Sequence, residues 1–208
     1  MRIRPGSRAW GSRGWIAAVV AAVCCVAAAI GFGAVLPYYS HLAYPLGLLG
    51  ATGMPHALGF NLSGFVLPGM LLAWVALGLR SSLPDGVGGS ARIGAWLLLF
   101  STLAFAAQGV FSLDSDDLDA AGSRRHVAAW VLWWLAFAAG AGLFAAGTRR
   151  VPGWRTLSIS GVAVAAAMLV FVLFTPATWG GAVPQRIAFA LWFGWWLFAG
   201  RALTRDAA

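Results

Sequence analysis

The chain has 208 residues, of which 61% are hydrophobic and only 10% are charged, against about 25% charged residues in a typical soluble domain. Charge this sparse excludes a water-soluble globule. The net charge of +8 comes from 14 basic residues, all of them arginine, in short clusters between apolar runs. This distribution is typical of membrane topology signals and lipid headgroup contacts, and it argues against nucleic-acid binding.

Six apolar runs follow one another along the chain, each long enough to cross a bilayer as a helix. Backbone polar groups in lipid must be paired within the chain, and these runs lack the short length and the alternation of barrel strands. We therefore expect an all-α polytopic membrane protein, one domain over residues 1–208, built as a bundle of six transmembrane helices. The expected spans cover residues 14–36, 56–79, 93–111, 126–148, 154–174 and 186–201.

Two features interrupt this simple pattern. The loop over residues 38–55 is rich in glycine and proline but unusually apolar, so part of it is expected to lie in the interface or to reach back into the bundle. Pro68, with Gly64 before it and Gly69 after it, is expected to kink the second span. The first apolar run follows an arginine-rich stretch like a signal peptide, but its length favours a retained helix.

The arginines are distributed unequally between the two sides of the expected bundle. Eleven fall on the side of the chain termini: Arg2, Arg4, Arg8, Arg13, Arg80, Arg92, Arg149, Arg150, Arg155, Arg201 and Arg205. Three fall on the opposite side: Arg124, Arg125 and Arg186. The positive-inside rule therefore places both termini in the cytoplasm, and the loops at 38–55, 112–125 and 175–185 outside.

The polar residues that could form a site gather on the outer side. His56 opens the second span with Ser63 on the same helical face and Asn61 beside them, and Gln108 lies near the outer end of the third span. Asp114, at the third span's end, and His126, at the fourth span's start, are expected to pair at the mouth of this site. Further aspartates and one more histidine lie on the same side: Asp116, Asp117, Asp119 and His41.

Three interpretations of this cluster remain open. His56, Asp114 and His126 are suitable metal ligands, although no recognised metal-binding spacing is present and no cofactor is indicated. A pocket for a lipid or other amphipathic molecule would have walls from the aromatic faces of the fourth and sixth spans, formed by Trp130, Trp133, Trp134, Phe137, Phe189, Trp192, Phe193, Trp195 and Trp196. In the third interpretation the aspartates are solvated loop charges and the aromatic residues only pack helices together.

The segment LGATGMPHALGFNLSGFVLPG, the later FSLD and His126 together resemble the bacterial membrane family called domain of unknown function 998. The resemblance covers most of the chain, implies a six-span layout in the bacterial inner membrane, and supplies no activity. By position it singles out Leu49, Gly50, Pro55, Asn61, Phe111, Asp114 and His126. Ser112 stands where the family usually has proline, and the acidic residue that often precedes the Leu-Gly pair is missing.

From these observations we expect a protein that binds or moves a small amphipathic or lipid-like molecule at an outward-facing site, with membrane lipids as partners. The alternatives are an intramembrane enzyme using an Asp114–His126 pair, as a metal-dependent hydrolase or on an isoprenoid, and a structural membrane subunit. A proton-coupled transporter is disfavoured because no ionisable residue lies at the centre of any expected span.

Overall fold

The computed structural model describes residues 7–174 and 181–205, and every regular element in these two ranges is helical. The expected all-α fold is confirmed. The elements are α1 (Ser7–Val35), the 3-10 helix η1 (Leu46–Gly50), α2 (Ala57–Phe60), the π-helix η2 (Asn61–Val66), α3 (Leu67–Ser81), α4 (Gly89–Val110), α5 (Ala121–Thr148), α6 (Arg155–Leu173) and α7 (Ala182–Arg205).

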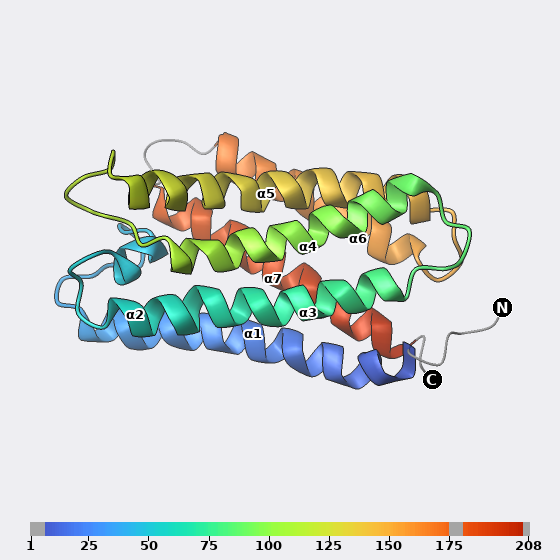
Figure 1. Ribbon diagram of the computed structural model, residues 1–208, viewed down its shortest axis with the longest axis horizontal. Helices are drawn as coiled ribbons and strands as arrows, with labels where there is room; N and C mark the ends of the chain where they lie inside the picture. Colours follow the sequence, from blue (N-terminus) through green and yellow to red (C-terminus); the bar gives the residue numbers. More distant parts are fainter. Residues whose placement is uncertain (1–6, 175–180, 206–208) are drawn as a thin grey trace.

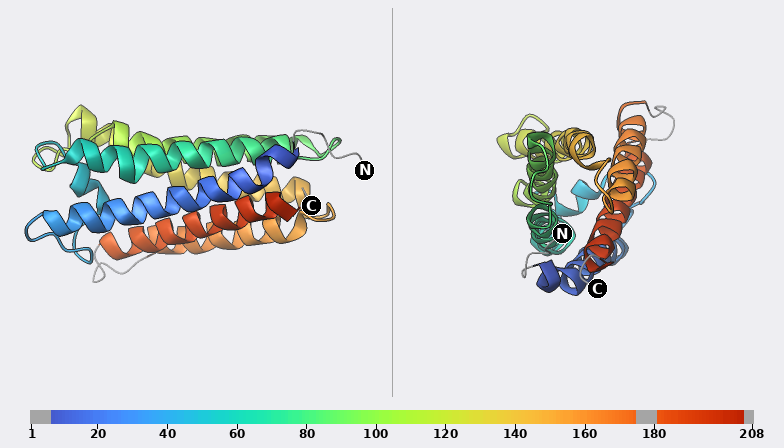
Figure 2. Two further views of the ribbon diagram at one scale, coloured as in Figure 1. Left: turned by 90° about the horizontal axis from the view of Figure 1, so that it is seen from below. Right: turned by 90° about the vertical axis from the view of Figure 1, so that its right-hand side faces the viewer.

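Six helical segments in the described residues are long and apolar enough to cross a membrane, with α2, η2 and α3 forming one of them. Each segment packs against the next along the chain, and α1 packs against α7. The six segments therefore form a closed ring, which is seen from the side in Figure 1 and from one end in Figure 2. A multi-pass membrane protein follows from this arrangement.

The two ends of the ring differ in their residues. We call one the histidine end, because His41, His56 and His126 lie on or beside the loops there, at the left of Figure 1. We call the other the arginine end. It holds the start of α1, the end of α7 and the turns after α3 and α5, and its described arginines include Arg13, Arg80, Arg92, Arg149, Arg150, Arg155 and Arg201.

Most helices begin earlier than the apolar runs indicated. α4 begins at Gly89 rather than Ile93, α5 at Ala121 rather than His126, and α7 at Ala182 rather than Arg186. The apolar pattern marks only the part of a helix in hydrocarbon, whereas the helix continues into the headgroup region where polar side chains are solvated. The turn expected over residues 175–185 lies mostly outside the described residues, as do Arg2 and Arg4.

The second span is distorted one turn before its proline. Pro68 has no N–H to donate to the carbonyl four residues earlier, so a regular α-helix cannot continue through this point. The backbone instead widens into the π-helical turn η2, in which the Leu67 N–H donates to the Leu62 carbonyl five residues back. The α-helical hydrogen-bond pattern is thus interrupted directly before Pro68, where the sequence predicts a kink, and π-helical turns of this kind are frequent at functional sites.

Aromatic rings fill the middle of the ring of helices. Phe105 of α4 stacks on Trp192 of α7 with ring centroids 4.9 Å apart, and Trp133 of α5 meets Phe189 of α7 at the same distance. Ser101 links these rings by accepting from Trp192 Nε1 at 3.2 Å and donating to the Trp133 carbonyl at 2.9 Å. The rings are buried against one another, so in this part of the bundle the helix-packing interpretation of the aromatic stripe is correct.

Candidate functional site

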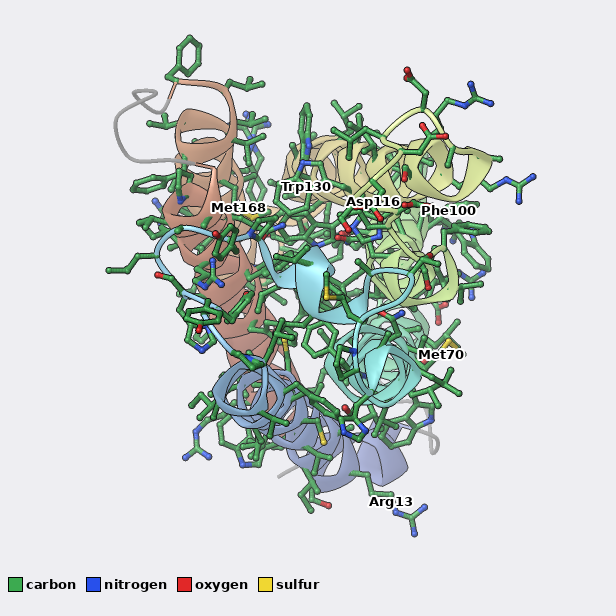
Figure 3. All side chains as sticks on the ribbon, turned by 90° about the vertical axis from the view of Figure 1, so that its left-hand side faces the viewer. Arg13, Met70, Phe100, Asp116, Trp130 and Met168 are labelled. Carbon is green, nitrogen blue, oxygen red and sulfur yellow. The ribbon has the colours of Figure 1, made fainter. Side chains whose placement is uncertain are left out.

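A short apolar plug occupies the middle of the histidine end. The plug is η1, with the sequence LGLLG, and it contacts α1, α2 and α4. Figure 3 views the bundle from this end and shows η1 at the centre of the ring, with Trp130 on the α5 side. Leu46, Gly47, Leu49 and Gly50 are buried, so the expectation that part of the 38–55 loop reaches into the bundle is confirmed.

Two amides from separate helices hold the plug by its backbone. Gln185 of α7 accepts a hydrogen bond from the Leu46 N–H at 3.0 Å. Asn61 of η2 donates from Nδ2 to the Gly50 carbonyl at 2.9 Å and to Ser112 Oγ at 3.1 Å. These bonds satisfy backbone groups that would otherwise be unpaired inside the bundle. The plug is therefore fixed to both sides of the ring.

The two inner glycines of the plug are required by close contacts. A Cβ on Gly50 would collide with Asn61 Oδ1, and a Cβ on Gly47 would lie 2.9 Å from His126 Nε2. Real Cβ atoms essentially never approach other heavy atoms this closely. Asn61 and His126 thus both contact the plug, Asn61 at Gly50 and His126 at Gly47.

His126 is buried in the second turn of α5, with 7% of its surface exposed. Its Nδ1 lies 2.9 Å from the carbonyl oxygens of both Gln108 and Phe111. These two carbonyls belong to the C-terminal end of α4, where carbonyls have no partner within the helix. Because carbonyls only accept, Nδ1 must carry the proton, and Nε2 of the neutral ring has a free lone pair.

A cavity of about 560 Å³ lies beside the plug and includes His126. Its lining comes from the loop before and within η1 (Ala43, Pro45, Gly47), from Leu113, from α5 (His126, Val127, Trp130), from α6 (Phe171, Val172) and from the start of α7 (Gly181, Ala182, Pro184, Gln185). Apart from His126 and Gln185, the lining side chains are apolar. The cavity is therefore an amphipathic recess between the ends of α5, α6 and α7.

Gln185 gives this recess a hydrogen-bond donor. Its side-chain oxygen must face the Leu46 N–H, because a backbone N–H can only donate. This fixes the amide orientation and directs Nε2 elsewhere, where it makes no hydrogen bond with any described residue. Two lining residues of the recess, Gln185 and His126, thus each keep one polar atom without a hydrogen-bond partner among the described residues.

Asp114 does not pair with His126, which corrects our expectation. The Asp114 carboxylate accepts from the backbone N–H groups of Asp116 and Asp117 at 3.1 and 3.3 Å, and its own N–H donates to Ser123 Oγ at 2.9 Å. Because α4 ends at Val110 and α5 begins at Ala121, Asp114 lies within the loop and caps neither helix. Its side chain stabilises the turn of that loop.

His56 and Ser63 also lie apart from the recess. His56 is exposed, with a left-handed backbone (φ 61°) immediately before α2. Ser63 Oγ donates to the Gly59 carbonyl of its own helix at 2.7 Å. The described residues include no group of three or more His, Cys, Asp or Glu side chains that could hold a metal ion. The set His56, Asp114 and His126 is thus not assembled as ligands.

Gln108 is fully buried, and neither atom of its amide has a hydrogen-bond partner among the described residues. Its backbone carbonyl orients His126, but its side chain does not line the recess. An unpaired buried amide costs about 1–3 kcal/mol. Gln108 lies in the interior of the bundle, as expected, but no described residue forms a hydrogen bond with its side-chain amide.

The aromatic walls expected for the pocket are mostly absent from the recess. Of the aromatic residues expected on α5 and α7, only Trp130 lines it. Trp133, Phe189 and Trp192 are packed in the core. The other aromatic wall is Phe171 of α6, which the sequence did not single out because its helix carries no polar neighbour to mark it.

A second polar cluster at the histidine end centres on Arg186 of α7. Its guanidinium donates to the Tyr39 hydroxyl and to the Tyr44 carbonyl, both at 2.9 Å, and to the Ala182 carbonyl at 3.0 Å. His41 Nδ1 lies 3.5 Å from the same guanidinium. Desolvation, and secondarily the positive charge of Arg186, hold the pKa of His41 below its ordinary value.

The same cluster perturbs Tyr39. Burial raises the pKa of its phenol, and the charge and hydrogen bond of Arg186 oppose that rise. Neither the cluster nor Gln185 was predicted, because 139 positions separate Gln185 from Leu46 along the chain. The available signal was a polar Gln–Arg pair directly before the last apolar run.

No family model, no curated protein and no solved structure matches this chain. Its function is accordingly inferred from the contacts within the chain itself.

Proposed function

We propose that this protein binds or moves a small amphipathic molecule in the recess between α5, α6 and α7. The observation that carries the proposal is that His126, whose Nδ1 is held by two backbone carbonyls, lines a mainly apolar cavity of about 560 Å³. That volume falls in the range of small-molecule sites, about 300–1,000 Å³, which are typically apolar with a few oriented polar groups.

The polar groups of the recess favour an uncharged headgroup. His126 Nε2 accepts a hydrogen bond when the ring is neutral, and the Gln185 amide nitrogen donates one. A hydroxyl both donates and accepts, so an alcohol or glycerol headgroup on an apolar body fits this pair. In the described ranges 7–174 and 181–205, no carboxylate or guanidinium lines the recess, so a charged headgroup finds no counter-charge from these residues.

The orientation of the protein follows from its arginines under the positive-inside rule. We infer that the arginine end faces the cytoplasm of a bacterial cell and that the recess opens at the outer leaflet of the inner membrane. We also propose that the chain is related to the domain of unknown function 998 family, which would have the same setting. The motif positions of that likeness include Gly50, Asn61 and His126, which lie together around the plug.

The test is to purify the protein in a mild detergent and to identify co-purified amphiphiles by mass spectrometry. Val127→Phe fills the recess from its wall without touching the His126–carbonyl bonds. Val110→Phe is the matched control, because Val110 is also exposed at the histidine end but does not line the recess. We expect the bound amphiphile to be lost in Val127→Phe alone.

Equal amphiphile content in the two variants, or no enrichment in the wild type over an unrelated six-span protein, would contradict the proposal. The cavity's polar pair provides a second comparison. His126→Gln keeps a side chain of similar reach but removes the oriented lone pair, so it should reduce retention of a hydroxyl-bearing amphiphile more than that of a simple alkane.

One observation favours an enzyme as the second candidate. A histidine that lines a cavity and whose Nδ1–H is held by two acceptors has the tautomer of a general base, with the lone pair on Nε2. In this case the wild-type protein would convert the bound molecule chemically during incubation. The His126→Gln variant would not convert the fraction of that molecule that it still binds. Retention without conversion in the wild type would favour the binding function.

A further inference from the structure

The turn between α5 and α6 gathers three arginines at the arginine end. Arg149 follows the last residue of α5, Arg150 comes next, and Arg155 is the first residue of α6. All three are exposed. They share a cavity of about 520 Å³ that is completed by Val151, Pro152 and Ile159. Three guanidinium groups therefore surround one hollow.

The turn that carries these arginines is rigidly supported from below. Thr148 and Ser158 are buried and their hydroxyl oxygens lie 2.8 Å apart, which joins the end of α5 to the first turn of α6. Trp154 is buried and packs on Phe144 with ring centroids 5.8 Å apart. The arginines thus project from a fixed base, and a ligand would need to order only their side chains.

The three arginines lack the partners that other arginines of this protein have. Arg80 lies 4.3 Å over the Trp96 ring and shares its cavity with Asp85, and Arg201 lies 5.5 Å over the Trp15 ring. The guanidinium groups of Arg149, Arg150 and Arg155 make no hydrogen bond, ion pair or ring contact with the described residues. Among the described residues, no acidic side chain lines their cavity. Their charges repel one another until an anion binds.

The position of the cavity indicates what kind of anion fits. It lies where two helices that are long and apolar enough to cross a membrane end, and the ends of such helices lie at the level of the lipid headgroups. Directly along α6, Ile159 and Val162 expose 53% and 42% of their surfaces, an apolar strip on which an acyl chain can lie. Arginine binds phosphate oxygens through several parallel hydrogen bonds, and basic pockets at this level of a membrane recognise lipid headgroups.

We propose that the α5–α6 turn binds the phosphate of an anionic phospholipid from the leaflet at the arginine end, with an acyl chain of that lipid along Ile159 and Val162. This site is separate from the recess at the histidine end and takes a different ligand. Lipid at this position would balance the three charges and fix the α5–α6 corner in the membrane.

The test measures phospholipid binding to the full-length protein by native mass spectrometry, with phosphatidylglycerol and phosphatidylcholine of the same chains as probes. Arg149→Gln/Arg150→Gln/Arg155→Gln removes the site. Arg13→Gln/Arg80→Gln/Arg201→Gln removes the same charge from the same end and is the matched control. We expect at least about tenfold weaker phosphatidylglycerol binding in the first variant, and a change within about twofold in the control.

A second variant protects the test against misfolding of the triple variant. Ile159→Glu places a carboxylate in the same cavity without removing any arginine, and it should weaken phosphatidylglycerol binding to a similar degree. Equal binding of the two lipids by the wild type, equal loss in the two triple variants, or equally tight binding of free inorganic phosphate would each overturn the proposal.

Discussion

The two ends of the helical ring handle polar groups in opposite ways. At the histidine end, polar side chains point inward and fix backbone: His126 binds two carbonyls of α4, and Asn61 and Gln185 hold the plug. At the arginine end the turns are short, and Arg149, Arg150 and Arg155 are exposed without partners in the described chain. Internal hydrogen bonds hold the histidine end together, whereas the arginine end exposes positive charges that can bind a ligand from outside the chain.

The two ends therefore suit different kinds of ligand. Inward polar groups that bond mainly to the protein's own backbone leave only a few unpaired positions, such as His126 Nε2, and a few oriented polar groups suit the selection of a particular molecule. Exposed like charges are not selective by shape and suit a headgroup present throughout a leaflet. If the histidine end is held rigid by hydrogen bonds within the chain, substitutions that break those bonds should reduce the stability of the protein.

Gly50→Ala should be the most damaging single change to the histidine end. Its Cβ would collide with Asn61 Oδ1, so the plug or Asn61 must shift, at a cost of about 3 kcal/mol of unfolding free energy. Gly142→Ala is the control, because nothing lies within 4 Å of its Cβ position. Thermal unfolding can be followed by thiol labelling of buried Cys25. Equal stability of the two variants would show that the plug is not tightly held.

His126→Asn should destabilise the protein by about 2 kcal/mol, because asparagine is too short to satisfy both α4 carbonyls and leaves part of the ring volume empty. His56→Asn changes an exposed histidine with left-handed backbone, which asparagine tolerates, and should change the stability by less than about 0.5 kcal/mol. The same thiol-labelling assay compares them. A loss of similar size in both variants would mean that the His126 bonds contribute little.

Gln108→Leu should stabilise the protein by about 1 kcal/mol, because it removes a buried amide without a partner in the described residues. The same substitution at Gln185 should destabilise it, since the Leu46 N–H would lose its acceptor. Stability changes of opposite sign for Gln108→Leu and Gln185→Leu would show that the Gln108 amide is unpaired and that the Gln185 amide holds the plug. A loss of stability or of bound amphiphile in Gln108→Leu would show that a ligand or water uses this amide.

Much of the fold could be predicted from the sequence because it depends on local apolar length. Six spans, their order and the disturbance before Pro68 follow from residues close together in the chain. The helix starts could not be placed in the same way. Hydropathy falls at the headgroup level while the backbone remains helical, so the start of α5 at Ala121 put His126 inside a helix rather than at its cap.

The sequence predicted some of the residues at the candidate site, but it did not predict which groups these residues contact. His126 and Asn61 were singled out, and both hold the histidine end together. Their partners are backbone carbonyls, however, and a backbone group carries no mark in a sequence. This is why the sequence favours Asp114, at the end of the third span, as the partner of His126 at the start of the fourth, whereas the Asp114 carboxylate accepts from its own loop.

Acidification should weaken the histidine end slightly and leave the arginine end unaffected. Burial, and secondarily the charge of Arg186, hold the pKa of His41 below its ordinary value, near 6.5. Between the folded pKa and that value, the unfolded chain binds more protons, so the stability that depends on neutral His41 is present above pH 6.5 and is lost as the pH falls through the folded pKa. His41 is largely solvated, so the effect should be well under about 1 kcal/mol.

The measurement is an NMR titration of the His41 ring in micelles. Arg186→Gln removes the secondary cause and should move the pKa of His41 part of the way back, while the desolvation remains. Tyr39→Phe is the control, since it removes one partner of the guanidinium at 2.9 Å and keeps the charge. If Arg186→Gln lowered this pKa, or left it unchanged, the guanidinium would not be facing His41. The histidine end would then lack the cluster that ties α7 to the loop before the plug.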